Sequence, residues 1–448
     1  MSTVAAPEAA RTVAAPQRTS LPLTQLVTLS IYWLGIQTIW AGLNNVVLAD
    51  RFNTLGPGIA GSLLAITMGA GAIAAILVQP TVGVISDYTI SRWGRRKPYI
   101  VIGTAFDLLF LAGLAFSNGF IAMVAFYFLL QTSSNFAQGP FQGYVPDLVP
   151  ARQVGLASGL MGLMLTVGAI AGVGIASIGP QFVSEPIAVL GLGVVEAATM
   201  IVLVSSVREG SVAPHRTMGW RQLALSAWAR DILKERDVLW LLVVRLLFLG
   251  AYNVTAIALL YFERSFGLET AEAKSTLFIG TAIVAAMTAL AALPGGRLSD
   301  RFGRRPVIWT AAVIATVGLL GATVAPTPAL AIASWVPFGI GIGTFLSADW
   351  ALMADVIPKG TTGRYMGILN AGTAMAGPVF ILVAGPLQDL VGAMVGVPYG
   401  PRAALGVAAL FVVLSALALT RVDPRRREES EALVSISEPG TAAGVVTP

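Results

Sequence analysis

Residues 86–96 read SDYTISRWGRR, and a shorter version of the same stretch, SDRFGRR, returns at residues 299–305. Each copy stands between two long apolar runs. A second pair of segments repeats at a similar spacing, since YVPDLVPARQVG at 144–155 corresponds to LMADVIPKGTTG at 352–363. The copies lie about 210 residues apart. The chain is therefore predicted to contain two related halves in which the same helices follow in the same order.

The composition is that of a membrane protein. The 448 residues are 56% hydrophobic and 11% charged, whereas soluble proteins carry about 25% charged residues. Cysteine is absent and His215 is the single histidine, which excludes disulfides, cysteine nucleophiles and histidine metal clusters. The cations are not gathered in one basic domain, so no nucleic-acid partner is expected. No metal and no cofactor beyond a coupling ion are predicted, and the absence of a G-x-x-x-x-G-K-[ST] loop argues against an ATP-driven enzyme.

Twelve apolar stretches are long enough to cross a bilayer as helices, which takes about 20 residues each. We expect an all-α membrane protein in which twelve transmembrane helices form two six-helix bundles related by pseudo-two-fold symmetry. Both halves start on the same side of the membrane, so the repeat is parallel. The expected spans are 24–49, 58–86, 98–117, 120–147, 153–178, 186–206, 238–262, 271–296, 306–325, 328–355, 361–387 and 402–421.

Long polar stretches divide the chain into five parts. The two ends are polar and rich in alanine, proline or charge, and we expect both to be disordered. The predicted parts are a disordered cytoplasmic tail (1–22), an N-terminal six-helix bundle (23–206), a central cytoplasmic loop (207–237), a C-terminal six-helix bundle (238–422) and a disordered cytoplasmic tail (423–448).

The placement of lysine and arginine predicts the orientation, because cytoplasmic loops are enriched in these residues. With both termini inside, most of the 28 lysines and arginines face the cytoplasm, including those of SDYTISRWGRR. Arg245 lies within a span, and the outer side holds only Arg51, Arg264, Lys274 and Arg402. We therefore expect a multi-pass protein of the cell (plasma) membrane with both termini in the cytoplasm.

The repeated loop, in which a glycine and an aspartate end one helix and G-R-R follows, resembles a motif of the major facilitator superfamily, and the resemblance covers the chain between its tails. It implies a transporter fold and a latch that holds the cytoplasmic side shut. Asp87 would lie near the N-terminus of helix 11, where unpaired N–H groups favour a carboxylate. The counterpart at 300–305 would act against helix 5. The implied latch residues are Gly83, Asp87, Arg95, Arg96, Asp147, Asp300, Arg304, Arg305 and Asp355.

Three features give a closer likeness: the long loop SDYTISRWGRRKPYI, the segment YVPDLVPARQVGLASGLMG and an arginine early in helix 7. They look like the glycoside–pentoside–hexuronide:cation symporters and the sucrose–proton cotransporters. This implies uptake of a small-molecule solute, a sugar or glycoside, coupled to H⁺ or Na⁺, of which H⁺ is favoured. We also expect a monomer in the lipid bilayer. The second loop has the short form that many other carriers share. An efflux antiporter for drugs or metabolites and a non-transporting receptor or scaffold therefore remain open.

The candidate solute-binding residues follow helices 1, 4, 7 and 10, which line the cavity in this superfamily. Residues four, seven and eleven apart share a helix face, and polar groups facing lipid would lack partners. Amides and indoles suit a neutral polyhydroxylated ligand, although amides also join helices to one another. The candidates are Gln37, Trp40, Asn44, Gln131, Asn135, Gln138, Gln142, Tyr252, Asn253 and Trp350.

Four charged residues lie within the predicted spans. Arg245 and Asp349 are each about 9 Å from the cytoplasmic end of their helix, so they can pair, with Asp355 as a competing partner. The pair would serve gating or coupling, or would only permit insertion into the membrane. Asp107 and Glu196 lie near mid-span. As neighbours they would share one proton and become rival proton carriers; otherwise each is satisfied locally.

Overall fold

The computed structural model describes residues 20–209, 219–222, 235–356 and 362–422. In this part of the chain, twelve helices are long and apolar enough to cross a membrane, and no residue is in a strand. Helices are the expected outcome, because the bilayer offers the backbone no water and each N–H and C=O must be satisfied within its own segment. Most of the predicted tails and of the central loop 207–237 lies outside the described residues.

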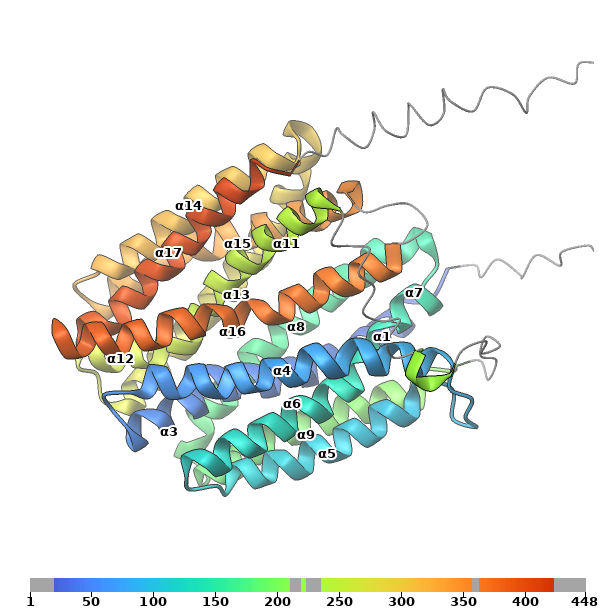
Figure 1. Ribbon diagram of the computed structural model, residues 1–448, viewed down its shortest axis with the longest axis horizontal. Helices are drawn as coiled ribbons and strands as arrows, with labels where there is room; N and C mark the ends of the chain where they lie inside the picture. The colour runs from blue at the N-terminus through green and yellow to red at the C-terminus, as the bar shows by residue number, and fades with distance from the viewer. Residues whose placement is uncertain (1–19, 210–218, 223–234, 357–361, 423–448) are drawn as a thin grey trace, which may run out of the picture.

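The N-terminal bundle contains the first six membrane-crossing helices (Figure 1). Two short elements, α7 (Tyr144–Leu148) and η2 (Ala151–Gln153), follow helix 4. Helix 1 is composed of α1 (Leu23–Ser30), α2 (Tyr32–Gly42), the π-helical segment η1 (Leu43–Val47) and α3 (Leu48–Leu55). Helices 2 to 6 are α4 (Ala60–Asp87), α5 (Lys97–Ala115), α6 (Phe120–Gln142), α8 (Val154–Ile178), which continues into η3 (Gly179–Gln181), and α9 (Glu185–Ser206).

The C-terminal bundle repeats this order. Helix 7 is interrupted at the position that corresponds to the interruption of helix 1, but its irregular segment is a 3₁₀-helix and not a π-helix. It comprises α11 (Arg236–Tyr252), η5 (Asn253–Ile257) and α12 (Ala258–Phe266). Helices 8 to 12 are α13 (Thr270–Phe302), α14 (Arg304–Val324), α15 (Pro328–Val356), α16 (Thr362–Met394) and α17 (Tyr399–Leu419).

The twelve predicted spans are confirmed, with differences at their ends. Helix 4 ends at Gln142 rather than at residue 147, and the chain turns into α7. At this helix end Gly143 leaves room for the guanidinium of Arg96, which a Cβ there would overlap. Helices 8 and 11 extend beyond their predicted ends, to Phe302 and Met394.

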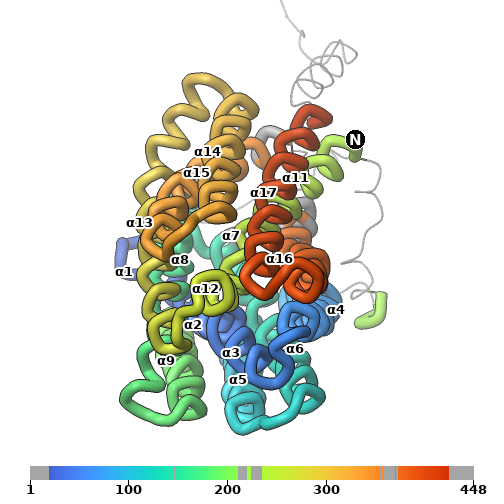
Figure 2. The backbone as a smooth tube through the Cα atoms, turned by 90° about the vertical axis from the view of Figure 1, so that its left-hand side faces the viewer, coloured from blue at the N-terminus to red at the C-terminus, as the bar shows by residue number. Residues whose placement is uncertain are grey.

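The bundles meet along two helix pairs, α4 with α16 and α8 with α13, which lie side by side in Figure 2 as well. We call the end that holds the two GRR loops the basic end, and the end where α3 and α12 lie the opposite end. Near the opposite end α4 and α16 approach closely. A Cβ on Gly61 would lie 2.9 Å from the carbonyl carbon of Gly385 and 3.0 Å from its Cα, so only glycine fits.

Two hydrogen bonds lie on the pseudo-two-fold axis. Thr255 Oγ1 is 3.4 Å from Asn45 Oδ1, and Asn53 Nδ2 donates to Glu263 Oε2 at 2.8 Å. The partners are 210 residues apart in both cases. This is also the spacing of η1 and η5. A residue can contact its own counterpart only at the axis that relates the halves. Helices 1 and 7 therefore cross at the axis, where both are irregular.

Candidate functional site

Polar side chains of helices 1 and 4 form one network inside the N-terminal bundle. Tyr127 on α6 donates its hydroxyl hydrogen to Asn44 Oδ1 on η1 at 3.1 Å and accepts from Gln131 Nε2 at 3.3 Å. Asn135 Nδ2 donates in turn to Gln131 Oε1 at 3.0 Å and to the Gln131 carbonyl at 2.7 Å. The Trp40 ring meets the Tyr127 ring edge-on at 5.7 Å. The predicted stripes of the two helices are therefore joined, through a tyrosine that sequence reasoning missed.

The remaining candidates of helices 1 and 4 are placed differently. Gln138 accepts a hydrogen bond from Gln79 on α4 at 3.1 Å, so it links two helices of one bundle, which was the alternative reading of these amides. Gln37 and Gln142 are half-buried. Gln131 and Asn135 are thus linked to helix 1 through Tyr127. Gln138, further along helix 4, is linked to helix 2 instead.

The candidates on helix 7 lie beside its irregular segment. Asn253 begins η5 and donates to the carbonyl of Leu249, one turn back, at 2.8 Å. The Asn253 amide also packs against Gly377 of α16, where a Cβ would lie 2.6 Å from Asn253 Oδ1. Tyr252 precedes it and is half-buried. π-helical and 3₁₀ stretches within helices often mark functional hinges. The irregular segments of helices 1 and 7 therefore indicate a functional site.

Arg245 and Asp349 form a buried ion pair between α11 and α15, with side-chain exposures of 3% and 0%. Arg245 Nη2 also donates to Thr373 Oγ1 on α16 at 2.9 Å, and its guanidinium lies 5.8 Å from the Trp350 ring. The predicted pairing across two helices is present. The side chain of Asp355, the competing partner, lies outside the described residues.

Asp107 and Glu196 are neighbours in the core of the N-terminal bundle. They face each other from α5 and α9 as hydrogen-bonding partners, with exposures of 0% and 1%. Ser133 donates its hydroxyl hydrogen to Asp107 Oδ1, and Tyr32 donates to Glu196 Oε1 at 3.3 Å. The sequence analysis expected the two residues to share a proton only if they were neighbours, and in the structure they are neighbours.

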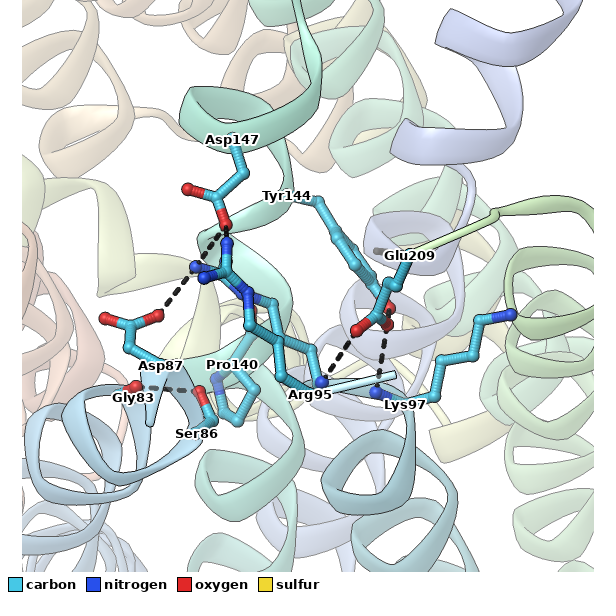
Figure 3. A network of polar contacts seen from close by, with 10 residues as sticks. Gly83, Ser86, Asp87, Arg95, Lys97, Pro140, Tyr144, Asp147 and Glu209 are labelled. Carbon is cyan, nitrogen blue, oxygen red and sulfur yellow. Dashed lines mark hydrogen bonds and ion pairs between the residues drawn. The ribbon is translucent and has the colours of Figure 1, made fainter. Parts of the chain in front are cut away.

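The first GRR loop forms a network at the basic end, drawn in Figure 3. Arg96 Nη2 lies 2.7 Å from Asp87 Oδ1 and 2.7 Å from Asp147 Oδ2, and Arg96 Nη1 donates to the carbonyl of Pro140 at 3.1 Å. Arg95 pairs with Asp147 as well. Arg96 thus joins the end of helix 2 to helix 4 and to α7, and Arg95 binds α7 as well. Whether Asp87 also approaches helix 11 stays a prediction, because residues 357–361 lie outside the described part.

Glu209 completes this network and was not predicted. Its carboxylate accepts from the backbone N–H groups of Arg96 at 2.8 Å and Lys97 at 3.1 Å, where α5 begins, and from the hydroxyl of Tyr144. Such acceptors stabilise a helix N-terminus. Burial and the nearby Glu209 carboxylate raise the pKa of Tyr144, so its hydroxyl stays protonated and keeps donating. Glu209 therefore ties the start of the central loop to the GRR loop.

Gly83 and the second GRR loop hold helices within their own bundles. The Gly83 carbonyl accepts from Ser86 Oγ at 2.7 Å. Asp300 pairs with Arg304 one turn later on the chain. Arg305 donates to the carbonyls of Leu419 and Thr420 at 3.2 and 3.1 Å. It therefore binds the end of helix 12, whose last carbonyls lack partners within the helix. The expected contact of residues 300–305 with helix 5 stays a prediction.

Polar contacts between the bundles gather at the opposite end. Lys274 Nζ lies 2.6 Å from Asp50 Oδ2, and Arg264 Nη2 donates to Asn53 Oδ1 at 2.7 Å. Asp389 of α16 accepts from the backbone N–H of Ser62 at 2.6 Å and from that of Gly61 at 3.1 Å, so it caps α4 from the other bundle. Sequence reasoning missed these contacts between the bundles, although two of the four predicted outer cations, Arg264 and Lys274, take part in them.

Replacing Arg96 by alanine is expected to lower the stability of the purified protein by about 1–2 kcal/mol, because Asp87 and the Pro140 carbonyl lose their donor and Asp147 keeps only Arg95, in a partly exposed site. Thermal unfolding in detergent measures the loss. Arg92→Ala is the matched control, since Arg92 lies in the same loop, exposed, over the Trp93 ring. Equal midpoints for the two variants would show that the network does not stabilise the fold.

The sequence profile of the Major Facilitator Superfamily matches residues 26–289 and 241–442, which together span most of the chain. The chain belongs to the major facilitator superfamily. Its twelve helices in two bundles are the fold that this superfamily membership and the repeated loop both predict.

Curated relatives of this major facilitator protein are sucrose transport proteins. SUT1 of Oryza sativa subsp. japonica is 30% identical over 160 residues, which are 31% of this chain and 29% of that protein. SUC4 of Arabidopsis thaliana is 29% identical over 184 residues, 36% of this chain and 35% of that protein. The matches thus span about a third of the length of these relatives.

Solved structures of similar shape include a mutant form of the nucleoside transporter NupG, with a TM-score of 0.70, 14% identity and coverage of 89% of this chain and 99% of that one. The D-xylose-proton symporter has a TM-score of 0.65 and 17% identity, with coverage of 89% and 96%. At these identities, the likeness concerns the fold alone.

Proposed function

We propose that this protein is a secondary active transporter that takes up a sugar or glycoside together with H⁺ by alternating access. The observation that carries the proposal is the uncharged polar network of Asn44, Tyr127, Gln131 and Asn135, which joins helices 1 and 4. Amides and a phenol offer paired donors and acceptors without charge, which suits a neutral polyhydroxylated solute. Trp40, packed against Tyr127, adds an apolar ring face on which a sugar can stack.

The relatives support this choice of solute and ion. Proteins named sucrose transport proteins share segments of sequence with this chain, and a D-xylose-proton symporter shares its shape. Neither fact names the solute of this protein, and an efflux antiporter is compatible with the same fold. The uncharged character of the network favours a sugar over the charged drugs or metabolites that an antiporter would expel.

The proposed location is the plasma membrane, with a monomer spanning it and the basic end in the cytoplasm. The support is the bias of lysine and arginine toward that end. The clasp around Asp389 then closes the outer side, and the structure is a state in which the outer gate is shut. The Arg245–Asp349 pair joins helices 7 and 10 and acts as a gating pair in this scheme.

The proposal is tested with the purified protein in liposomes. Sucrose, other disaccharides and aryl glycosides are offered with an inward H⁺ gradient, with an inward Na⁺ gradient and with neither. Accumulation of at least one sugar that depends on the H⁺ gradient supports the proposal. If no sugar enters under any gradient, and cells lacking the protein become sensitive to toxic compounds, the efflux reading replaces it.

Tyr127→Phe is expected to raise the apparent KM for the transported sugar about five- to tenfold, because the amides of helices 1 and 4 lose the hydroxyl that orients them. The maximal rate should change little, since Tyr127 is 1% exposed and its ring still fills the same space. Uptake kinetics in liposomes give both values. Tyr399→Phe is the control at an exposed tyrosine, and an unchanged KM in Tyr127→Phe would remove the network from solute binding.

A further inference from the structure

The four carboxyl oxygens of Asp107 and Glu196 are satisfied only if the pair holds a proton. Two of them accept from hydroxyls, Asp107 Oδ1 from Ser133 and Glu196 Oε1 from Tyr32. The other two, Asp107 Oδ2 and Glu196 Oε2, are buried without a donor among the described residues. Since the two carboxyl groups lie within hydrogen-bond reach of each other, one proton held between them makes one group a donor and the other its acceptor. One bound proton therefore gives each of the two carboxyl groups a complete set of hydrogen-bond partners.

The surroundings supply no positive charge in place of that proton. Within the described part of the chain, neither carboxyl takes part in an ion pair with lysine, arginine or histidine. Tyr32 is the one other titratable side chain there that contacts the pair. Two adjacent carboxylates that are buried in a core rarely both ionise. The Asp349 carboxylate differs, because Arg245 compensates its charge.

The pair contacts helix 1 at Tyr32 and Gly35, before the part of that helix that carries Trp40 and Asn44. The Tyr32 hydroxyl lies 2.6 Å from Thr104 Oγ1 on α5 and reaches Glu196 on α9. Gly35, one turn further along helix 1, packs against the backbone of Glu196, since a Cβ there would lie 2.7 Å from Glu196 Cα. Helix 1 continues to Trp40 and Asn44. A change in the charge of the pair thus acts on the helix that carries Asn44 of the polar network.

We propose that the Asp107–Glu196 pair is the binding site of the transported proton, and that Tyr32 couples its occupancy to helix 1. This inference rests on the proposed H⁺-coupled uptake. In the loaded state, the pair shares one proton and is sealed in the core, as seen here. Release returns the proton to water and leaves two carboxylates, so it needs a conformation in which water reaches the pair. Proton release is thereby tied to the movement of the bundles.

The test compares Asp107→Asn and Glu196→Gln with the wild type in liposomes. Both variants keep the shape of the pair and supply a permanent donor in place of the proton. H⁺-driven accumulation is expected to fall about tenfold or more, the size of a typical coupling free energy, while exchange of labelled for unlabelled sugar without a gradient continues. Glu185→Gln is the matched control, because this half-exposed carboxylate pairs with Arg51 away from the core.

The outcomes separate this inference from the proposed function. If the wild type takes up no sugar with H⁺, the proposed function fails. If the wild type is H⁺-coupled and both variants accumulate sugar with the same dependence on pH, the proton of the pair is a permanent part of the fold and the inference fails. Loss of accumulation and of exchange together, in protein that unfolds at the wild-type temperature, would also contradict it, because a coupling site is not needed for exchange.

A second measurement does not depend on how well those variants fold. Tyr32→Phe keeps both carboxyls and is expected to shift the midpoint of the pH dependence of uptake without changing sugar exchange. Infrared spectra of the wild type should show a protonated-carboxyl band that diminishes as the pH is raised while sugar is being exchanged. A band that stays constant over this range, with an unchanged pH midpoint in Tyr32→Phe, would overturn the inference.

Discussion

Gly61→Ala is expected to reduce the rate of sugar uptake by about tenfold or more, because the added methyl group costs roughly 1–3 kcal/mol of overpacking each time the opposite end closes. The Cβ would lie 2.9 and 3.0 Å from the carbonyl carbon and the Cα of Gly385. Backbone atoms cannot turn aside as a flexible side chain can. The substitution therefore acts on the closed state alone, and it shifts the protein toward conformations that are open at this end.

The chain is suited to a direct measurement of this shift, since it contains no cysteine. A single Asn45→Cys, introduced beside Thr255 at the axis, should react faster with a membrane-impermeant maleimide when Gly61 is alanine. Gly69→Ala is the matched control two turns further along α4, where a Cβ would make ordinary contact with Leu382 at 3.4 Å. Equal labelling rates and equal uptake in the two glycine variants would show that the close approach does not limit closure.

Asp349→Asn and Arg245→Gln are each expected to destabilise the protein by about 3–5 kcal/mol, because removal of one partner leaves the other as an unpaired charge in the core. Arg245 would keep Thr373 but lose its counter-charge, and Asp349 would lose its donor altogether. The double variant Arg245→Leu/Asp349→Leu should recover much of this stability, since buried ion pairs are replaced by apolar residues at little cost. Thermal unfolding in detergent measures all three.

Uptake by the same three variants shows whether the Arg245–Asp349 pair takes part in gating or only stabilises the protein. We expect the double variant to fold well and still fail to transport, because a gate that opens and closes needs charges that can part and pair again. Sugar uptake by the double variant at the wild-type rate would assign the pair to membrane insertion and stability alone. The Lys274–Asp50 pair at the bundle seam offers a control, since a charge exchange there should preserve both stability and transport.

The spans were predictable because a helix that crosses the bilayer must consist mainly of apolar residues, so a long apolar run in the sequence indicates a membrane helix. The ends of the spans were harder. Helix 4 ends at Gln142, where Gly143 leaves room for Arg96, 47 residues back in the chain, and hydropathy carries no sign of that contact. The Arg245–Asp349 pair was predictable from depth alone, because a charge in a membrane helix requires a partner at its own level.

The rest of the site depends on contacts between residues far apart in the sequence. Tyr127 reads as one more aromatic residue in an apolar helix until Asn44 is placed 3.1 Å from its hydroxyl. Asp389 and Ser62 are 327 residues apart, and no local pattern announces that the first caps the helix of the second. Glu209 was counted with the central loop, and only the fold brings it to the start of α5.

The contacts at the axis carry a consequence for how such a molecule could arise by duplication of a half-length gene. In a dimer of identical halves, every axis residue would meet its own copy, as in any isologous interface. A glutamate at the position of Glu263 would then oppose a second glutamate. Fusion into one polypeptide frees the two positions to differ, and here asparagine at 53 donates to glutamate at 263. Two different residues can thus face each other at the axis only after the two halves have been joined in one chain.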